Sequence, residues 1–82
     1  MKDTSNLADN FLEQLHKKIG ANVKKLRKKQ NISQLKLSLA MGYSSVTTIS
    51  CAEIYHKQIH FNIEHLAKIA YILDIDICEF FK

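Results

Sequence analysis

The chain has 82 residues, a length that suits one domain and is short for an enzyme built from several layers. Its apolar fraction of 46% is ordinary for a globular protein, and no apolar run approaches the roughly 18 residues of a membrane span. Two cysteines cannot form a disulfide scaffold and no secretory leader opens the sequence, so a cytoplasmic location is expected. With no proline and two glycines, the composition argues against a sandwich or barrel and predicts an all-α domain.

The net charge of +4 is unevenly distributed along the chain. Residues 1–16 carry one lysine against three acidic residues, and residues 37–82 carry three lysines against five acidic residues. Residues 17–36 carry eight cations and no anion. Such a block is either a helix face in contact with water or a footprint for phosphate groups, and charge alone favours the first interpretation.

The first predicted helix runs from about Leu7 to Gln30, because apolar residues recur along it at spacings of four and three. These residues are Leu7, Phe11, Leu15, Ile19, Val23 and Leu26. Gly20 costs about 1 kcal/mol inside a helix relative to alanine, so either one rod or two helices with a bend is compatible with the pattern. Asn31 is expected to end the helix in a left-handed conformation.

Two short helices joined by a turn at Gly42 are predicted next. Ser33 can cap the first of them, and its buried side carries Leu37, Ala40 and Met41. Gly42 suits the turn because glycine enters positive φ without steric cost.

Ser44 or Ser45 can cap the third helix, in which Ile49 and Ala52 point inward. Its other face is small, polar and uncharged, and consists of Thr47, Thr48, Ser50 and Cys51. The β-branched residues in this stretch would also tolerate a strand, so the helix is predicted from the surrounding pattern more than from propensity.

The periodicity breaks from Ile54 to Phe61, where a loop is expected. Asn62 can cap a fourth helix that ends at Asp74 in the left-handed region. The inward residues of this helix are Leu66, Ile69, Ala70 and Leu73. Asp76 can then cap a last short helical turn that brings Ile77, Phe80 and Phe81 to the chain end.

Small and apolar residues follow one another at defined spacings between Ser33 and Glu53. Counting Gln34 as first, the small Ser38 is fifth and Gly42 is ninth, with a branched Ile49 in the following helix. A small residue lets two helices approach closely, and the apolar residues fix their angle so that the second helix stands clear of the body.

This pattern resembles the lambda-repressor-like (Cro/repressor, XRE-type) helix-turn-helix family. The resemblance covers about Ile19 to Phe81. Its motifs are Ser33-Gln34, Leu37, Gly42, Ile49-Ser50, Glu53, the run Leu66 to Ala70 and the closing Ile77 to Phe81. It implies a compact five-helix domain over residues 19–82, preceded by a helical extension over residues 1–18. Two features depart from the family: the turn has one extra residue at Tyr43 or Ser44, and the loop after Glu53 lacks the usual glycine and proline.

The resemblance also implies residue roles. The helix from about Ser45 to Glu53 would enter the DNA major groove, with base contacts from Ser45, Val46, Thr47, Thr48 and Cys51. Phosphate contacts would come from Ser33, Gln34, Lys36, Lys57, Lys24 and Lys28. In this context the basic block is interpreted as a phosphate-facing surface. Arg27 and Glu53 match a structural ion pair that joins the first and third helices.

No catalytic, cofactor or metal site is predicted. His56, His60 and His65 with Cys51 lack the spacing of a tetrahedral zinc site. The chain also lacks a paired carboxylate, a phosphate loop and a nucleophile with a base at useful spacing, so it is not expected to be an enzyme.

The function expected from these features is a sequence-specific regulator of transcription that binds double-stranded DNA as a homodimer on a two-fold operator. The candidate dimer surface is the C-terminal set Ile72, Ile77, Phe80 and Phe81. The alternative surface is the N-terminal stripe Leu7, Phe11 and Leu15, which could instead cover Leu35 and Leu39. A phage-type repressor, a restriction-modification controller and an antitoxin all fit this class. The alternative function is a protein-interaction module or antitoxin of the same fold that grips a partner protein through the N-terminal stripe.

Overall fold

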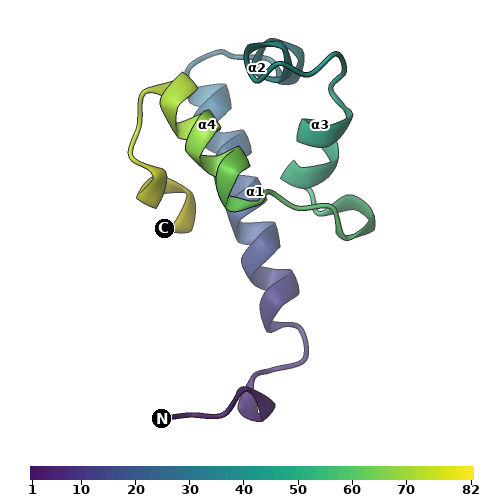
Figure 1. The fold of residues 1–82 in the computed structure, drawn as a ribbon, viewed down its shortest axis with the longest axis vertical. Helices are drawn as coiled ribbons and strands as arrows, with labels where there is room; N and C mark the ends of the chain where they lie inside the picture. The colour runs from purple at the N-terminus through teal and green to yellow at the C-terminus, as the bar shows by residue number, and fades with distance from the viewer.

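The computed structural model describes residues 1–82 and is helical throughout, without a strand. Its α-helices are α1 (Phe11–Lys29), α2 (Gln34–Ala40), α3 (Thr47–Glu53) and α4 (Ile63–Leu73), and its 3-10 helices are η1 (Thr4–Asn6), η2 (His56–Gln58) and η3 (Ile77–Phe81). The all-α prediction is confirmed. The fifth helix expected at the chain end is the 3-10 helix η3 (Figure 1).

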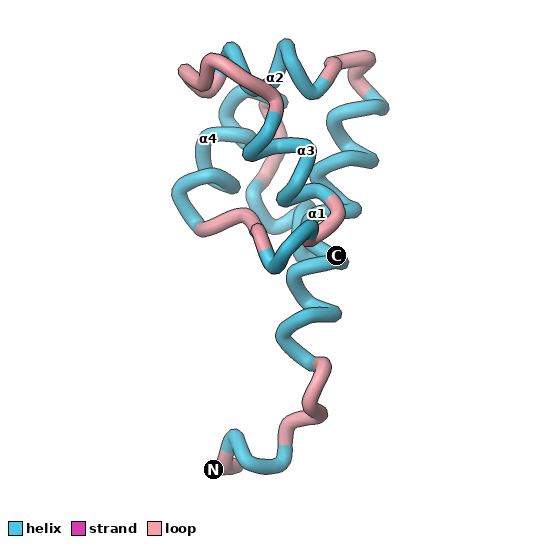
Figure 2. Tube along the Cα trace, turned by 90° about the vertical axis from the view of Figure 1, so that its right-hand side faces the viewer, coloured by secondary structure: helices cyan, strands magenta, loops and turns pink.

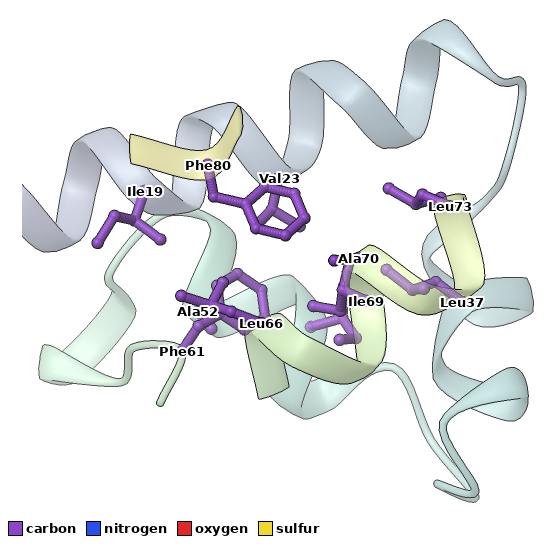
Figure 3. Packing of buried hydrophobic residues seen from close by; sticks show 11 residues of the cluster. Ile19, Val23, Leu37, Ala52, Phe61, Leu66, Ile69, Ala70, Leu73 and Phe80 are labelled. Carbon is purple, nitrogen blue, oxygen red and sulfur yellow. The ribbon is translucent and has the colours of Figure 1, made fainter. Parts of the chain in front are cut away.

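The C-terminal half of α1 forms one side of the body and packs against α3 and η3, while α2 packs against α3 and α4, and α4 also contacts η3 (Figures 1 and 2). Eleven apolar side chains form the core between these elements (Figure 3). They are Ile19, Val23, Leu37, Ile49, Ala52, Phe61, Leu66, Ile69, Ala70, Leu73 and Phe80. The predicted inward residues of α3 and α4 are all in this set. Of the three inward residues predicted for α2 only Leu37 is buried, because Ala40 is exposed and Met41 is half-buried at the edge of the core.

Helix α1 begins later than predicted and continues without a bend. It starts at Phe11 after Asn10, and Leu7 instead ends the short η1. The boundary expected between residues 18 and 19 therefore falls inside one continuous helix. Gly20 allows α1 and α3 to approach closely. A Cβ atom at this position would lie 2.5 Å from the Ala52 carbonyl oxygen and 2.6 Å from the Glu53 carbonyl oxygen. The absence of a side chain lets the C-terminal end of α3 contact α1.

Most helix ends are formed by the predicted residues. Asn31, Gly42 and Asp74 have φ values of 59°, 88° and 55°, which place all three in the left-handed region. Ser33 Oγ accepts a hydrogen bond from the Lys36 amide at 3.0 Å, and Asn62 Oδ1 accepts one from the His65 amide at 2.8 Å. Local hydrogen bonds of this kind satisfy amide groups that the helix itself leaves free.

The start of α3 differs from the prediction. Its N-cap residue is Val46, which has no side-chain oxygen to accept a hydrogen bond. Ser45 lies one residue earlier, and its Oγ accepts only a long hydrogen bond of 3.5 Å from the Thr47 amide. The helix is therefore shorter at this end than the expected Ser45–Glu53. No helix of the chain combines the length and apolar character needed to cross a membrane.

Candidate nucleic-acid interface

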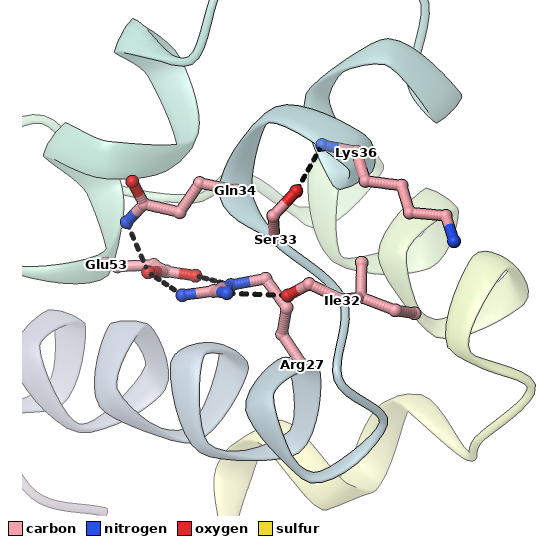
Figure 4. Close-up of polar contacts among 6 residues, drawn as sticks. All are labelled: Arg27, Ile32, Ser33, Gln34, Lys36 and Glu53. Carbon is pink, nitrogen blue, oxygen red and sulfur yellow. Dashed lines mark hydrogen bonds and ion pairs between the residues drawn. The ribbon is translucent and has the colours of Figure 1, made fainter.

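A buried ion pair joins α1 to the end of α3 (Figure 4). The Arg27 Nε and Nη2 atoms donate to the two Glu53 carboxylate oxygens at 2.8 and 3.0 Å. Arg27 Nη1 also donates to the carbonyl oxygen of Ile32 at 2.7 Å, in the segment between α1 and α2. The side chains of Arg27 and Glu53 are 5% and 0% exposed, so both charges are removed from water and neutralised by each other.

Gln34 belongs to the same network. Its Nε2 atom donates to Glu53 Oε1 at 2.9 Å, and the side chain is half-buried (Figure 4). The sequence had assigned this side chain to a phosphate contact, whereas in the structure it is committed to Glu53. Glu53 thus receives hydrogen bonds from both α1 and α2, and the network fixes the position of α3 relative to the two helices.

The outer face of α3 is free of charge. Ile49, Ala52 and Glu53 are buried, so helix geometry places the outward positions at Thr47, Ser50 and Cys51, with Ile54 one turn beyond Ser50. Thr47 and Ile54 are exposed, and the other two are half-buried.

The remaining predicted base-contact residues lie around the start of the helix. Ser45 is exposed in the preceding segment, while Val46 and Thr48 are half-buried. Ser50 and Ile54 were not in the predicted contact set. Their helical spacing from Thr47 is the signal that would have identified them.

Six of the seven lysines of the basic block lie on two stripes of α1, and the seventh, Lys36, lies in α2. Lys17, Lys24 and Lys28 recur at spacings of seven and four, on the side adjacent to Gly20 and Arg27, where α3 packs. Lys18, Lys25 and Lys29 form the second stripe, next to Asn22, whose side-chain amide donates to the Phe80 carbonyl at 2.9 Å. Only the first stripe borders α3.

Few of these cations are neutralised within the chain. The chain forms three ion pairs: Lys17 with Glu13, Arg27 with Glu53, and Lys82 with Glu79. Of the eight cations in residues 17–36, six therefore have no acidic partner. One of these six is the exposed Lys36 in α2, and Lys57 in η2 is exposed and unpaired as well. Ser33 is exposed, and its hydroxyl caps α2.

The loop that carries Lys57 has an unusual backbone. Tyr55, Lys57 and Gln58 have φ values of 58°, 51° and 64°, a left-handed conformation that is costly for residues other than glycine. An aromatic stack holds this loop against α1. The His16 ring lies 3.9 Å from the His60 ring and 5.5 Å from the Tyr55 ring, measured between centroids. Burial, and secondly the charge of His60, lowers the pKa of His16. No pattern along the chain predicts this stack, because it joins residues more than 35 positions apart.

The C-terminal dimer surface predicted from the sequence is largely absent. Phe80 is fully buried in the core, which contradicts its assignment to an interface, and Ile72 and Ile77 are half-buried against the same core. Only Phe81 is exposed. Phe80 is apolar because it belongs to the core, and Ile72 and Ile77 are apolar because they pack against it.

The N-terminal stripe does not cover Leu35 and Leu39, which was one of the two alternatives predicted for it. Leu7 and Phe11 are exposed, and so are Leu35 and Leu39 on α2, so the stripe does not cover α2. Cys78 is exposed. No three histidine, cysteine, aspartate or glutamate side chains gather where they could hold a metal ion.

No protein-family model matches the chain, and neither a curated protein nor a solved structure matches it.

Proposed function

We propose that this chain is a sequence-specific regulator of transcription that binds double-stranded DNA. In this proposal α2, the turn at Gly42 and α3 form a helix-turn-helix unit of the lambda-repressor-like class, and α3 enters the major groove. The observation that carries the proposal is the uncharged outer face of α3 beside Lys24 and Lys28, two lysines without acidic partners. Unpaired cations next to a neutral helix suit a ligand with a charged backbone and readable base edges.

The side chains on α3 have the chemistry for base contacts. The hydroxyls of Ser45, Thr47 and Thr48 can donate to or accept from base edges, and the methyl groups of Thr47 and Ile54 can pack on the methyl group of thymine. Cys51 lies one turn after Thr47 on the same face. The face has no arginine, asparagine or glutamine, the residues that make the strongest bidentate base contacts. Part of the sequence selectivity is then carried by DNA shape and by bridging water.

The phosphate contacts are assigned to four lysines without acidic partners on α1, α2 and the loop after α3. Lys24 and Lys28 lie on the stripe of α1 that borders α3, Lys36 lies on α2, and Lys57 lies in the loop that follows α3. Ser33 precedes α2 and completes this set. Gln34 is assigned a positioning role, since its amide already donates to Glu53.

The salt dependence of binding tests this proposal. We expect a random duplex to bind at low salt, with an affinity that falls about 10³-fold between 50 and 200 mM salt if ~6 phosphates are contacted. Fluorescence anisotropy with a labelled duplex measures this. The double substitution Lys24→Gln/Lys28→Gln should weaken binding and reduce the salt slope by about 2. The matched control Lys25→Gln/Lys29→Gln, on the other stripe of α1, should have a smaller effect. Absence of duplex binding at low salt would refute the proposal.

Selection from a random duplex pool then tests the assignment of α3. The pool enriched by the wild-type chain should show a preferred motif, and Thr47→Ala should change that motif at one or two positions. Tyr71→Ala, at a side chain that is 87% exposed on α4, is the control and should leave the motif unchanged.

The second candidate is a protein-interaction module or antitoxin of the same architecture. It is favoured by the exposed apolar side chains of Leu35 and Leu39 on α2, in addition to the N-terminal stripe. Binding through such side chains would change little with salt, in contrast to binding of phosphates. The anisotropy experiment therefore separates the two candidates.

A further inference from the structure

The N-terminal half of α1 forms an arm that extends away from the body, together with the residues before it (Figures 1 and 2). We define the arm as residues 7–18. The body lies around residues 19–30 of α1, where Ile19, Val23 and Arg27 are buried. On the arm, Phe11 and Leu12 are 46% and 60% exposed, whereas Leu15 is partly buried at its base.

The apolar stripe of the arm continues the stripe that packs into the core. Phe11, Leu15, Ile19 and Val23 follow one another at spacings of four along a single helix. The second half of this stripe is covered by core side chains, and Leu15 is partly buried, while Phe11 is in contact with water. Within the arm only the base is covered, by the packing of Leu15 on the core and by the stacking of His16 on Tyr55 and His60, and η1 has no buried residue that could cover the rest.

We propose that the arm binds a second copy of this chain, with the two arms packed antiparallel about a two-fold axis near residues 13 and 14. This proposal concerns dimer formation by the protein alone and does not require DNA binding. An axis at this place brings Leu12 of each copy against Leu15 of the other. Such an interface is self-complementary and closes at two copies.

The charge along α1 favours this antiparallel arrangement. Residues 1–16 carry three acidic residues against one lysine, whereas residues 17–36 carry only cations. An antiparallel pair places the acidic end of each arm beside the basic part of its neighbour, and a parallel pair would place like charges together. Asp9 and Lys18 have no ion-pair partner within the chain and lie at opposite ends of the arm. They are therefore available to pair between copies.

The exposed area suits a weak dimer. Ile59 and Phe81, on segments that contact α1, add to the apolar surface beside the arm and are 40% and 44% exposed. A large side chain that is about half exposed offers on the order of 80 Å². Leu7, Phe11, Leu12, Ile59 and Phe81 then give on the order of 800 Å² for two copies, below the roughly 1,200 Å² at which stable specific interfaces begin. We expect a reversible dimer with a dissociation constant on the order of 10–100 μM.

Sedimentation equilibrium of the DNA-free chain from about 1 μM to about 1 mM tests the proposal, over a range that spans the expected constant. Wild type should pass from monomer to dimer. Leu12→Asp should weaken the dimer roughly 100-fold, because a two-fold interface loses the leucine from both sides. Leu12 is exposed in the monomer, so this variant should keep the helical circular dichroism and the melting temperature of the wild-type chain.

Two further variants test the surface and its direction. Tyr71→Asp changes an exposed side chain of the groove between α2 and α4 and should leave the dimer unchanged. Asp9→Lys should weaken the dimer roughly five- to tenfold, and the double substitution Asp9→Lys/Lys18→Asp should restore it, because the opposite charges again meet at both ends.

Three results would overturn the proposal. A wild-type chain that stays monomeric throughout the concentration range has no such interface. A dimer that survives Leu12→Asp but is lost with Tyr71→Asp uses the groove instead. A charge swap that fails to restore the Asp9→Lys variant excludes the antiparallel arrangement. Because no DNA is present, each result is independent of the outcome of the duplex-binding experiment.

Discussion

The substitution Glu53→Ala should destabilise the fold strongly. Glu53 is 2% exposed and accepts hydrogen bonds at 2.8, 3.0 and 2.9 Å from Arg27 Nε, Arg27 Nη2 and Gln34 Nε2. Without the carboxylate, the Arg27 guanidinium stays buried with only the Ile32 carbonyl as a partner. Removing one member of a buried ion pair costs about 3–5 kcal/mol. An 82-residue domain has about 4–12 kcal/mol of stability in total, so the loss is a large part of it.

Urea denaturation followed by circular dichroism measures this loss. The midpoint should fall with an unchanged slope, and the melting temperature should drop by at least about 12 °C. The double substitution Arg27→Met/Glu53→Leu removes both charges and should lie within about 2 kcal/mol of wild type. Glu64→Ala, at an exposed glutamate in the first turn of α4, is the control for losing a carboxylate and should cost under about 1 kcal/mol. A loss below about 1 kcal/mol for Glu53→Ala would refute the reasoning.

Three smaller perturbations follow from single contacts. Ser38→Ala should raise the free energy of unfolding by about 1 kcal/mol in urea, because the buried Ser38 hydroxyl has no hydrogen-bond partner; destabilisation would show that it has one. Gly20→Ala should cost about 1–3 kcal/mol in the same assay, since its Cβ would meet the Ala52 carbonyl; the gain of about 1 kcal/mol typical of an exposed helix glycine would contradict that contact. Burial, and secondly the charge of Lys68, lowers the pKa of His65, and its neutral Nδ1 accepts a hydrogen bond from the Asn62 amide at 3.1 Å. The unfolded chain therefore binds a proton at His65 more readily than the folded chain does. The free energy of unfolding should therefore fall as the pH drops from about 7 to about 5. His65→Gln, which keeps a hydrogen-bond acceptor, should flatten this pH dependence in urea titrations at several pH values. An unchanged pH dependence in this variant would exclude His65 as its source.

The features that the sequence predicted correctly depend on neighbours along the chain. Ser33 and Asn62 cap helices because each side chain reaches an amide three residues later. Asn31 and Asp74 end helices because short polar side chains tolerate the left-handed region. The inward faces of α3 and α4 were predicted because a helix buries one stripe, and that stripe is visible in the spacing of apolar residues.

The errors arise where an apolar residue has more than one possible partner. Phe80 was assigned to a dimer surface, yet it is completely buried in the core beside α1. Phe11 fits the same stripe as Ile19 and is exposed, because the body ends before it. Spacing along a helix indicates which residues share a face, but the element that covers the face is set by the tertiary fold. Gly20 shows the same limit, since its role depends on α3, more than 25 residues away.

The candidate site was only partly predictable, because its contacts also join residues that lie far apart in the sequence. The pair of Arg27 and Glu53 was expected from the resemblance, and the structure adds that Gln34 donates to the same carboxylate. A single buried glutamate thereby fixes α3 against both α1 and α2. The outer face of α3 offers only uncharged side chains, whose individual base contacts are weak. Under the proposed function, the rigid orientation of α3 then matters as much as its contacts. Substitutions at Thr47 should alter selectivity at constant stability, while substitutions at Glu53 should lower stability and affinity together.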